Sequence, residues 1–139
     1  MYCLDANVWI YFLDADLPEH DAARDGVADL LRRKPLFTTT VLQMEVVHYL
    51  TNQLAEGEEQ VDAFLSMKDV SVAELRTEDV DRAADLLATH DQAGIGGRDA
   101  TILAAMERHE VSRLWTHAEG LKRMAERLDW LSVTDPVTG

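Results

Sequence analysis

The sequence predicts an α/β fold built around a mostly parallel sheet. Short apolar runs that suit buried strands alternate along the chain with longer segments that carry apolar residues at helical spacing. The chain has 139 residues, a mass of 15.6 kDa and a hydrophobic fraction of 47%, which suits one domain with a core of its own. No linker or internal repeat divides it, so a single domain is expected over residues 1–139.

In the first half of the chain, strands and helices are predicted to alternate twice. "YCLD" at 2–5 reads as a strand, and Asn7 to about Leu13 as a short helix. Pro18 opens a longer helix with Val27, Leu30 and Leu31 on one face. "PLFTTT" at 35–40 is a second strand, whose last threonines can cap a helix over 41–54, and 57–67 forms a further helix.

The second half repeats this alternation. "VSVAEL" at 70–75 is a third strand, and Thr77 followed by two acids starts a helix over 78–90, because acids in a first turn complement the exposed amides. The loop "QAGIGG" at 92–97 precedes a helix over 98–109. A fourth strand at 112–116, a helix at 118–128 and an edge strand at 128–133 complete the prediction, with a tail that is expected to be frayed from about residue 134.

The charge balance is strongly acidic. Twenty-six acids stand against 13 bases, only three of which are lysines, and the formal net charge is -13. Such a surface repels nucleic acid at long range, because affinity for phosphates normally comes from Lys and Arg. Two interpretations stay open: the partner is not a polyanion, or the protein works in high salt, where repulsion is screened.

The sequence also predicts a cytoplasmic protein. No apolar run approaches the length that crosses a bilayer. The N-terminus lacks a basic leader and places Asp5 where the apolar part of a signal peptide would build up. The single cysteine, Cys3, is expected to be a small buried hydrophobe.

Three acids do not fit the general pattern of solvated helix faces. Asp5 ends the first strand within an apolar stretch, and its simplest explanation is an N-cap for the helix that follows. Glu45 lies within "TVLQMEVVHYL", a helix that is apolar nearly all round, where an isolated carboxylate must pair with an arginine, lose its charge or bind a metal. Asp99 lies in the first turn of another apolar helix, where the helix dipole favours an acid.

Together these acids predict a metal centre. In parallel sheets, ligands gather outside the carboxyl ends of the strands, and Asp5, Glu45 and Asp99 are all placed to reach that edge. Carboxylates without cysteine or clustered histidine select hard cations, chiefly Mg²⁺ or Mn²⁺. Such a site suits hydrolysis of phosphodiesters, with Arg98 or Arg123 as further phosphate contacts.

The order of these motifs resembles the PIN domain family and, in length and layout, its VapC-type toxins. The motifs are "LDANVWIYF", "TTTVLQMEVVHYL" and "GRDATILAAMERHEVSRLWTHAEGLKRM". The resemblance implies a three-layer α/β/α sandwich and a Mg²⁺- or Mn²⁺-dependent endoribonuclease that forms a homodimer and binds a cognate antitoxin. It makes Asp5, Glu45 and Asp99 the metal-binding acids, with Asn7 and Thr116 in support. For the dimer, an apolar patch from the early helices is expected, including Trp9, Tyr11 and Phe12.

One position departs from the family pattern. Where the family usually has an acid two residues after Thr116, this chain has Ala118, and Glu119 either takes that place or is a solvated residue of the next helix. The departure leaves open a non-catalytic PIN-like module that binds protein or RNA. A phosphatase of the haloacid dehalogenase kind ranks lower, because Asn7 has no carboxyl proton to donate and Lys122 is the only lysine available near the later acids.

Overall fold

The computed structural model describes residues 1–138, and the strands in that range form one parallel sheet. Their order across the sheet is β3-β2-β1-β4-β5, and every neighbouring pair is parallel. The predicted α/β class is therefore confirmed, and the edge strand joins the sheet with the same direction as the rest. The strands are β1 (Tyr2–Leu4), β2 (Leu36–Thr39), β3 (Val70–Ala73), β4 (Arg113–Trp115) and β5 (Ser132–Thr134).

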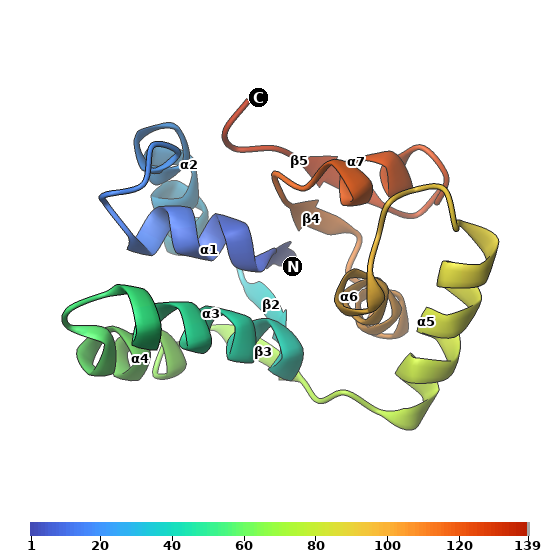
Figure 1. The fold of residues 1–139 in the computed structure, drawn as a ribbon, viewed down its shortest axis with the longest axis horizontal. Coiled ribbons are helices and arrows are strands. Elements are labelled where there is room, and N and C mark those ends of the chain that lie inside the picture. The colour runs from blue at the N-terminus through green and yellow to red at the C-terminus, as the bar shows by residue number, and fades with distance from the viewer. Residues whose placement is uncertain (139) are drawn as a thin grey trace.

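Helices cover both faces of the sheet. Figure 1 shows α1 to α4 on one side and α5 to α7 on the other, which gives the three layers of an α/β/α sandwich. The helices are α1 (Ala6–Leu13), α2 (His20–Arg33), α3 (Thr40–Gln53), α4 (Gly57–Leu65), α5 (Thr77–Thr89), α6 (Gly97–Arg108) and α7 (Glu119–Ala125). None of these helices is long and apolar enough to cross a membrane.

The path of the chain creates a crevice beside β1. From the central β1 the chain adds β2 and β3 on one side, then returns to add β4 and β5 on the other. Such a reversal of strand order leaves a crevice at the carboxyl ends of the two strands that flank it, here β1 and β4. The register pairs Leu4 with Trp115, so Asp5 and Thr116 leave the sheet next to each other.

The core lies on both faces of the sheet, and α6 contributes more buried residues to it than any other helix. Six of the twelve residues of α6 are buried, so this helix is enclosed on most sides. By contrast α3 buries only Leu42, Val46 and Leu50, and Met44 is 63% exposed. The prediction that α3 is largely buried is therefore wrong, because α3 belongs to an outer layer and presents one face to solvent.

Two other sequence predictions need correction. Trp9 is 1% exposed and packs edge-on against Phe64 of α4, with ring centroids 5.1 Å apart, so it is part of the core and not of a dimer surface. Pro18 lies in a turn, closed by a hydrogen bond from the His20 amide to the Leu17 carbonyl, and α2 begins at His20.

Gly120 of α7 lies where a side chain has no room. A Cβ atom at this position would stand 2.5 Å from the carbonyl oxygen of Gly94, which has a φ of +82° and carries the loop toward α6. We expect Gly120→Ala to lower the free energy of unfolding by about 1–3 kcal/mol, since backbone atoms have to move. The measurement is urea unfolding followed by circular dichroism.

A matched change in α2 gives the control. A Cβ atom at Gly26 would make ordinary van der Waals contact with the Trp115 ring at 3.5 Å, within a helix interior. Gly26→Ala is therefore expected to stabilise the protein by about 0.5–1 kcal/mol. Equal stability of the Gly120→Ala variant and the wild type would contradict the packing described here.

Candidate functional site

Asp5 stands where the central strand ends and α1 begins. Its Oδ1 atom accepts a hydrogen bond from the Ala6 amide at 2.8 Å, and its Oδ2 atom accepts one from the Thr116 hydroxyl at 2.7 Å. The residue is 6% exposed. The expected helix cap is therefore present, and the same carboxylate also bonds to the loop that follows β4.

Asp99 is the third residue of α6. Its Oδ2 atom accepts a hydrogen bond from the Gly96 amide at 3.4 Å, so the carboxylate closes the first turn of the helix. The residue is half-buried. The N-terminal end of a helix favours negative charge, which makes a partly buried acid tolerable at this position.

Glu45 lies in α3, which contacts α6. Its side chain is 20% exposed, and its Oε2 atom is 3.0 Å from Nη1 of Arg98, the residue that precedes Asp99. The pairing with an arginine, left open by the sequence, is thus present. The arginine is 68% exposed, so its guanidinium covers Glu45 from the solvent side.

The three carboxyl groups influence one another electrostatically. Burial raises the pKa of Asp5, of Glu45 and of Asp99 above their ordinary values. The charge of Asp99 raises the pKa of Asp5 further, and the charges of both aspartates raise that of Glu45, against the opposing effect of Arg98. The structure therefore brings the three predicted acids into one region of excess negative charge.

The chemistry of this region fits a hard cation. Its donors are carboxylate oxygens, which Mg²⁺ and Mn²⁺ prefer, and a cation would stabilise the ionised forms that burial disfavours in all three acids and that neighbouring acids disfavour further in Asp5 and Glu45. With the side chains as they stand, no group of three or more His, Cys, Asp or Glu residues within 1–138 is gathered closely enough to hold an ion. The guanidinium of Arg98 supplies the positive charge at Glu45 in this arrangement.

Thr116 and Asn7 hold the two strand ends together. Thr116 is fully buried; its hydroxyl donates to Asp5 and accepts a hydrogen bond from the Ala118 amide at 3.0 Å. The Oδ1 atom of Asn7 accepts from the amide of His117 at 3.4 Å. Asn7 thus acts on the loop after β4, whereas the direct partner of Asp5 is Thr116.

The position of the missing fourth acid is not filled by Glu119. Ala118 is the N-cap residue of α7, and the Glu119 side chain is exposed and pairs with Lys122 at 3.1 Å. Arg123, a predicted phosphate contact, donates instead to the carbonyl of Ala93 at 2.9 Å and so braces the loop before α6.

A second polar cluster, which the sequence did not predict, adjoins the site. Asp135 follows β5 and is 7% exposed. Its Oδ2 atom bonds to Lys122, to Nδ1 of His117 at 2.9 Å and to the Thr138 hydroxyl at 2.7 Å. Burial alone would raise the pKa of Asp135, but the hydrogen bonds from Lys122, Thr138 and His117 outweigh it and hold that pKa far below its usual range.

This cluster fixes both the chain end and a histidine. The Oδ1 atom of Asp135 accepts from the amides of Val137 and Thr138, so residues 134–138 are tied to the domain where a frayed tail was expected. An Asp before a Pro signals such an Asx turn in the sequence. Because an ionised carboxylate only accepts hydrogen bonds, Nδ1 of His117 must carry the proton.

A shallow groove extends from Glu45 along α3. It has a volume of about 430 Å³ and is lined by Glu45, Arg98, His48 and Tyr49, among others. The groove gives an extended ligand access to the acidic region from the solvent side of α3. The Tyr49 hydroxyl is engaged elsewhere, because it donates to Asp14 at 2.6 Å.

The raised pKa of Asp99 predicts that replacing this acid by a neutral residue increases the stability of the fold by an amount that depends on pH. A folded-state pKa above the unfolded value means that ionisation disfavours folding, so the penalty is absent at low pH and grows as the pH rises through the folded-state pKa. Asp99→Asn keeps a capping oxygen but cannot ionise. Without divalent cations, we expect the variant to gain stability over the wild type between pH 4 and 7 in urea unfolding.

Asp85→Asn removes one carboxylate from an exposed position of α5 and is the control, which is not expected to reproduce this gain. An Asp99→Asn variant whose stability relative to wild type falls as the pH rises would contradict the electrostatic description of the site.

Comparison with solved structures supports the fold in detail. VapC20 of Mycobacterium tuberculosis, described as a toxin that cleaves the sarcin-ricin loop, matches with a TM-score of 0.70 at 18% identity, over 82% of this chain and 87% of that one. FitAcB of Neisseria gonorrhoeae matches with a TM-score of 0.73 at 15% identity over 100% of both chains. VapBC-1 of nontypeable Haemophilus influenzae matches with a TM-score of 0.67 at 18% identity over 97% of both.

Comparison at the level of sequence identifies the family. No curated protein sequence matches this chain. The model of the PIN domain matches residues 2–127, which include β1 to β4 and all three acids of the site. The chain therefore belongs to the PIN domain family.

Proposed function

We propose that this protein is a metal-dependent endoribonuclease and the toxin of a toxin–antitoxin pair. The observation that carries the proposal is the electrostatic influence that Asp5, Glu45 and Asp99 have on one another beside the crevice of a PIN domain. The substrate is RNA, and the cation is Mg²⁺ or Mn²⁺.

When bound, the cation lowers the pKa of a water molecule and neutralises charge on the phosphate. The protein's own residues prepare the place for it. Asp5 and Asp99 offer carboxylate oxygens from two different elements, and the Thr116 hydroxyl fixes the orientation of Asp5. Burial of Asp5 and Thr116 excludes water from this end of the site and strengthens the interaction of Asp5 with positive charge.

Arg98 has a double role in this proposal. It pairs with Glu45 when no other cation is present, and its exposed guanidinium is free to turn toward a phosphate once Glu45 has a new partner. Since Ala118 supplies no fourth acid, one ion is proposed in preference to two.

An antitoxin is the proposed protein partner. The solved structures with this fold include VapBC2 of Rickettsia felis bound to a promoter DNA fragment. They also include a toxin–antitoxin complex of Klebsiella pneumoniae, which matches with a TM-score of 0.64 at 17% identity. A homodimer is also proposed. Large apolar side chains that are exposed on this chain and available for contacts include Met44, Val72, Leu75 and Val80.

Ala118 supports a second candidate function, a PIN-like module that binds RNA or protein without cleavage. The phosphatase alternative receives less support. Asn7 accepts a hydrogen bond from the backbone of His117, and Lys122 is engaged by Asp135 and Glu119, so neither is placed as that chemistry requires.

Cleavage of structured RNAs tests the proposal. With Mg²⁺ or Mn²⁺, the wild type is expected to cut at least one RNA of a varied panel, and Asp5→Asn or Asp99→Asn to lower the rate by at least about 100-fold, because each removes a charge that holds the cation. The exposed Asp85→Asn variant should keep the wild-type rate. Equal rates for Asp5→Asn and wild type would refute the nuclease, and binding without cleavage would favour the second candidate.

Metal binding has its own readout in stability. A cation that binds only the folded chain stabilises it by about 1.4 kcal/mol when its concentration is ten times its dissociation constant. We expect Mn²⁺ to raise the thermal midpoint of the wild type and of Asp85→Asn, but not that of Asp5→Asn. An equal shift in all three proteins would show that the ion binds elsewhere on the acidic surface.

A further inference from the structure

Two positive charges, Lys34 and Arg113, flank the start of β1 and have no acidic partner within residues 1–138. In that range eight of the 13 basic side chains form ion pairs with acids, and these two are not among them. The Tyr2 amide donates to the carbonyl of Pro35, next to Lys34, and Tyr2 pairs with Arg113 across the sheet. On a chain with a net charge of -13, two unpaired cations at one place make that part of the surface locally positive.

Aromatic rings lie between these charges. The Arg113 guanidinium stands 5.3 Å from the centre of the Tyr2 ring, and it also donates to the Tyr2 hydroxyl at 2.7 Å. Arg113 and Trp115 alternate with the buried Leu114, so they share one face of β4. The Trp115 ring is partly exposed and packs against α2 at Gly26.

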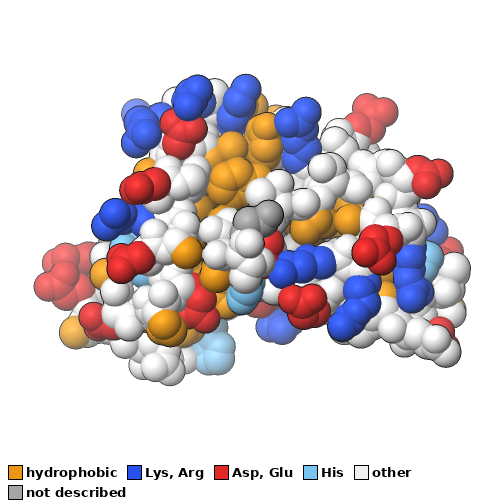
Figure 2. Space-filling model, turned by 90° about the horizontal axis from the view of Figure 1, so that it is seen from above, with side chains coloured by type: hydrophobic (Ala, Val, Ile, Leu, Met, Phe, Trp, Pro, Cys, Tyr) orange, Lys and Arg blue, Asp and Glu red, His pale blue; other side chains and the backbone are white. Residues whose placement is uncertain are grey.

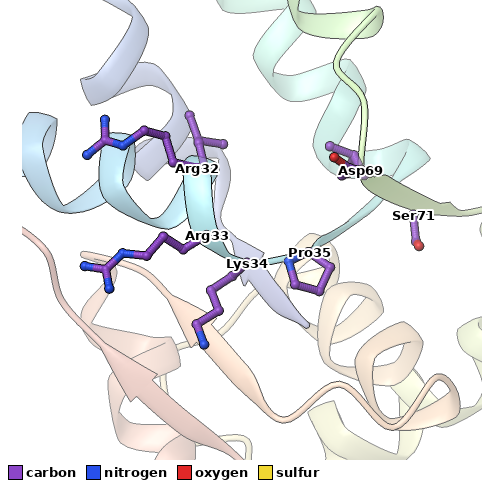
Figure 3. Close-up of a pocket in the computed structure, with 8 residues that line it drawn as sticks. Arg32, Arg33, Lys34, Pro35, Asp69 and Ser71 are labelled. Atoms are coloured by element: carbon purple, nitrogen blue, oxygen red, sulfur yellow. The ribbon is translucent and has the colours of Figure 1, made fainter.

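Tyr2 and Trp115 line a small concavity together with residues of α2 and its C-terminal end, and we call this concavity the β4 groove. It has a volume of about 230 Å³, and its other lining residues are Gly26, Asp29, Leu30, Arg33 and Lys34. Figure 3 shows a neighbouring pocket that Arg33 and Lys34 also line, and in it both side chains extend away from Asp69 and Ser71. Figure 2 shows one face of the molecule on which hydrophobic side chains at the surface have Lys and Arg side chains beside them. Arg33 is paired with Asp29 at 2.8 Å, so Lys34 is the lining base without an ion pair, and Arg113 lies beside the groove on Tyr2.

The short strand β4 connects the groove to the acidic site. The carbonyl of Trp115 accepts the hydrogen bond from the Asp5 amide at 2.9 Å, and the next residue, Thr116, holds the Asp5 carboxylate. The cations lie at the amino ends of the strands and the acids at the carboxyl ends, so the length of β4, roughly 10 Å, separates the groove from the candidate metal centre.

We propose that the β4 groove binds a single-stranded segment of the RNA substrate that flanks the scissile phosphate. The proposal rests on the nuclease function. It gives a place of binding to the phosphates of the substrate, which the acids of the site repel. A base stacks on Trp115, and phosphates bind Lys34 and Arg113, which is the combination that single-stranded nucleic acids use on protein surfaces. The concavity suits one base and is too small for a duplex. An acidic peptide would use the cations but would gain nothing from the exposed ring faces.

Binding is tested apart from cleavage. The parent protein carries Asp5→Asn, and a fluorescent single-stranded RNA of about ten nucleotides is titrated in EDTA, so that neither metal nor turnover contributes. Trp115→Leu should weaken binding by about tenfold or more, whereas Trp115→Phe should stay close to the parent, since stacking needs an aromatic face.

The charges are tested by their salt dependence. Lys34→Gln with Arg113→Gln should weaken binding and reduce the slope of log affinity against log salt by about 1.4, from two phosphate contacts on a single strand. Arg24→Gln with Arg76→Gln removes the same charge from exposed, ion-paired positions and should leave the slope of the parent.

Three results with RNA would overturn the inference: no RNA binding by the parent, equal binding by Trp115→Leu and parent, or equal weakening by both double variants. A fourth result would also overturn it. If the protein binds a poly-glutamate peptide in place of RNA, and the Lys34→Gln and Arg113→Gln variant loses this binding, the groove belongs to an acidic protein segment. Groove-dependent RNA binding by a wild type that cuts nothing would instead refute the nuclease alone.

Discussion

One carboxylate joins three elements of this fold. Asp5 ends β1, caps α1 through the Ala6 amide and accepts the Thr116 hydroxyl from the end of β4. All three connections occur at the point where the strand order reverses, which is where parallel sheets leave a crevice. The group that organises the crevice is thus also the anchor of the candidate metal centre.

The same arrangement concentrates negative charge. Burial raises the pKa values of the three acids, repulsion by neighbouring acids raises those of Asp5 and Glu45 further, and Arg98 offsets part of this at Glu45. Active sites commonly hold charges in an unfavourable state that a ligand then relieves. Against the long-range repulsion of a surface with a net charge of -13, a bound cation together with Lys34 and Arg113 at the β4 groove would supply the local attraction that RNA needs.

Much of the fold and of the site followed from local patterns. The alternation of strands and helices predicted the parallel sheet. The acids were predicted from three positions that need an explanation: Asp5 at a strand end, Glu45 within an apolar helix and Asp99 at a helix start. The sequence failed where distant segments meet. Trp9 is buried because α4 packs against it. Met44 is exposed because α3 lies in an outer layer. The Asp135 cluster forms because the end of β5 contacts the loop after β4. No local pattern around Asp135 indicates that Lys122 and His117 will surround it.

The most direct test of the candidate metal centre is an anomalous difference map from crystals of the wild type grown with Mn²⁺. A peak about 2.0–2.2 Å from carboxylate oxygens of Asp5 and Asp99, with the Glu45 side chain released from Arg98, is the expected result. A map in which Mn²⁺ binds only at other surface acids, while the Glu45–Arg98 pair stays closed and Asp5 and Asp99 have no ion, would contradict it.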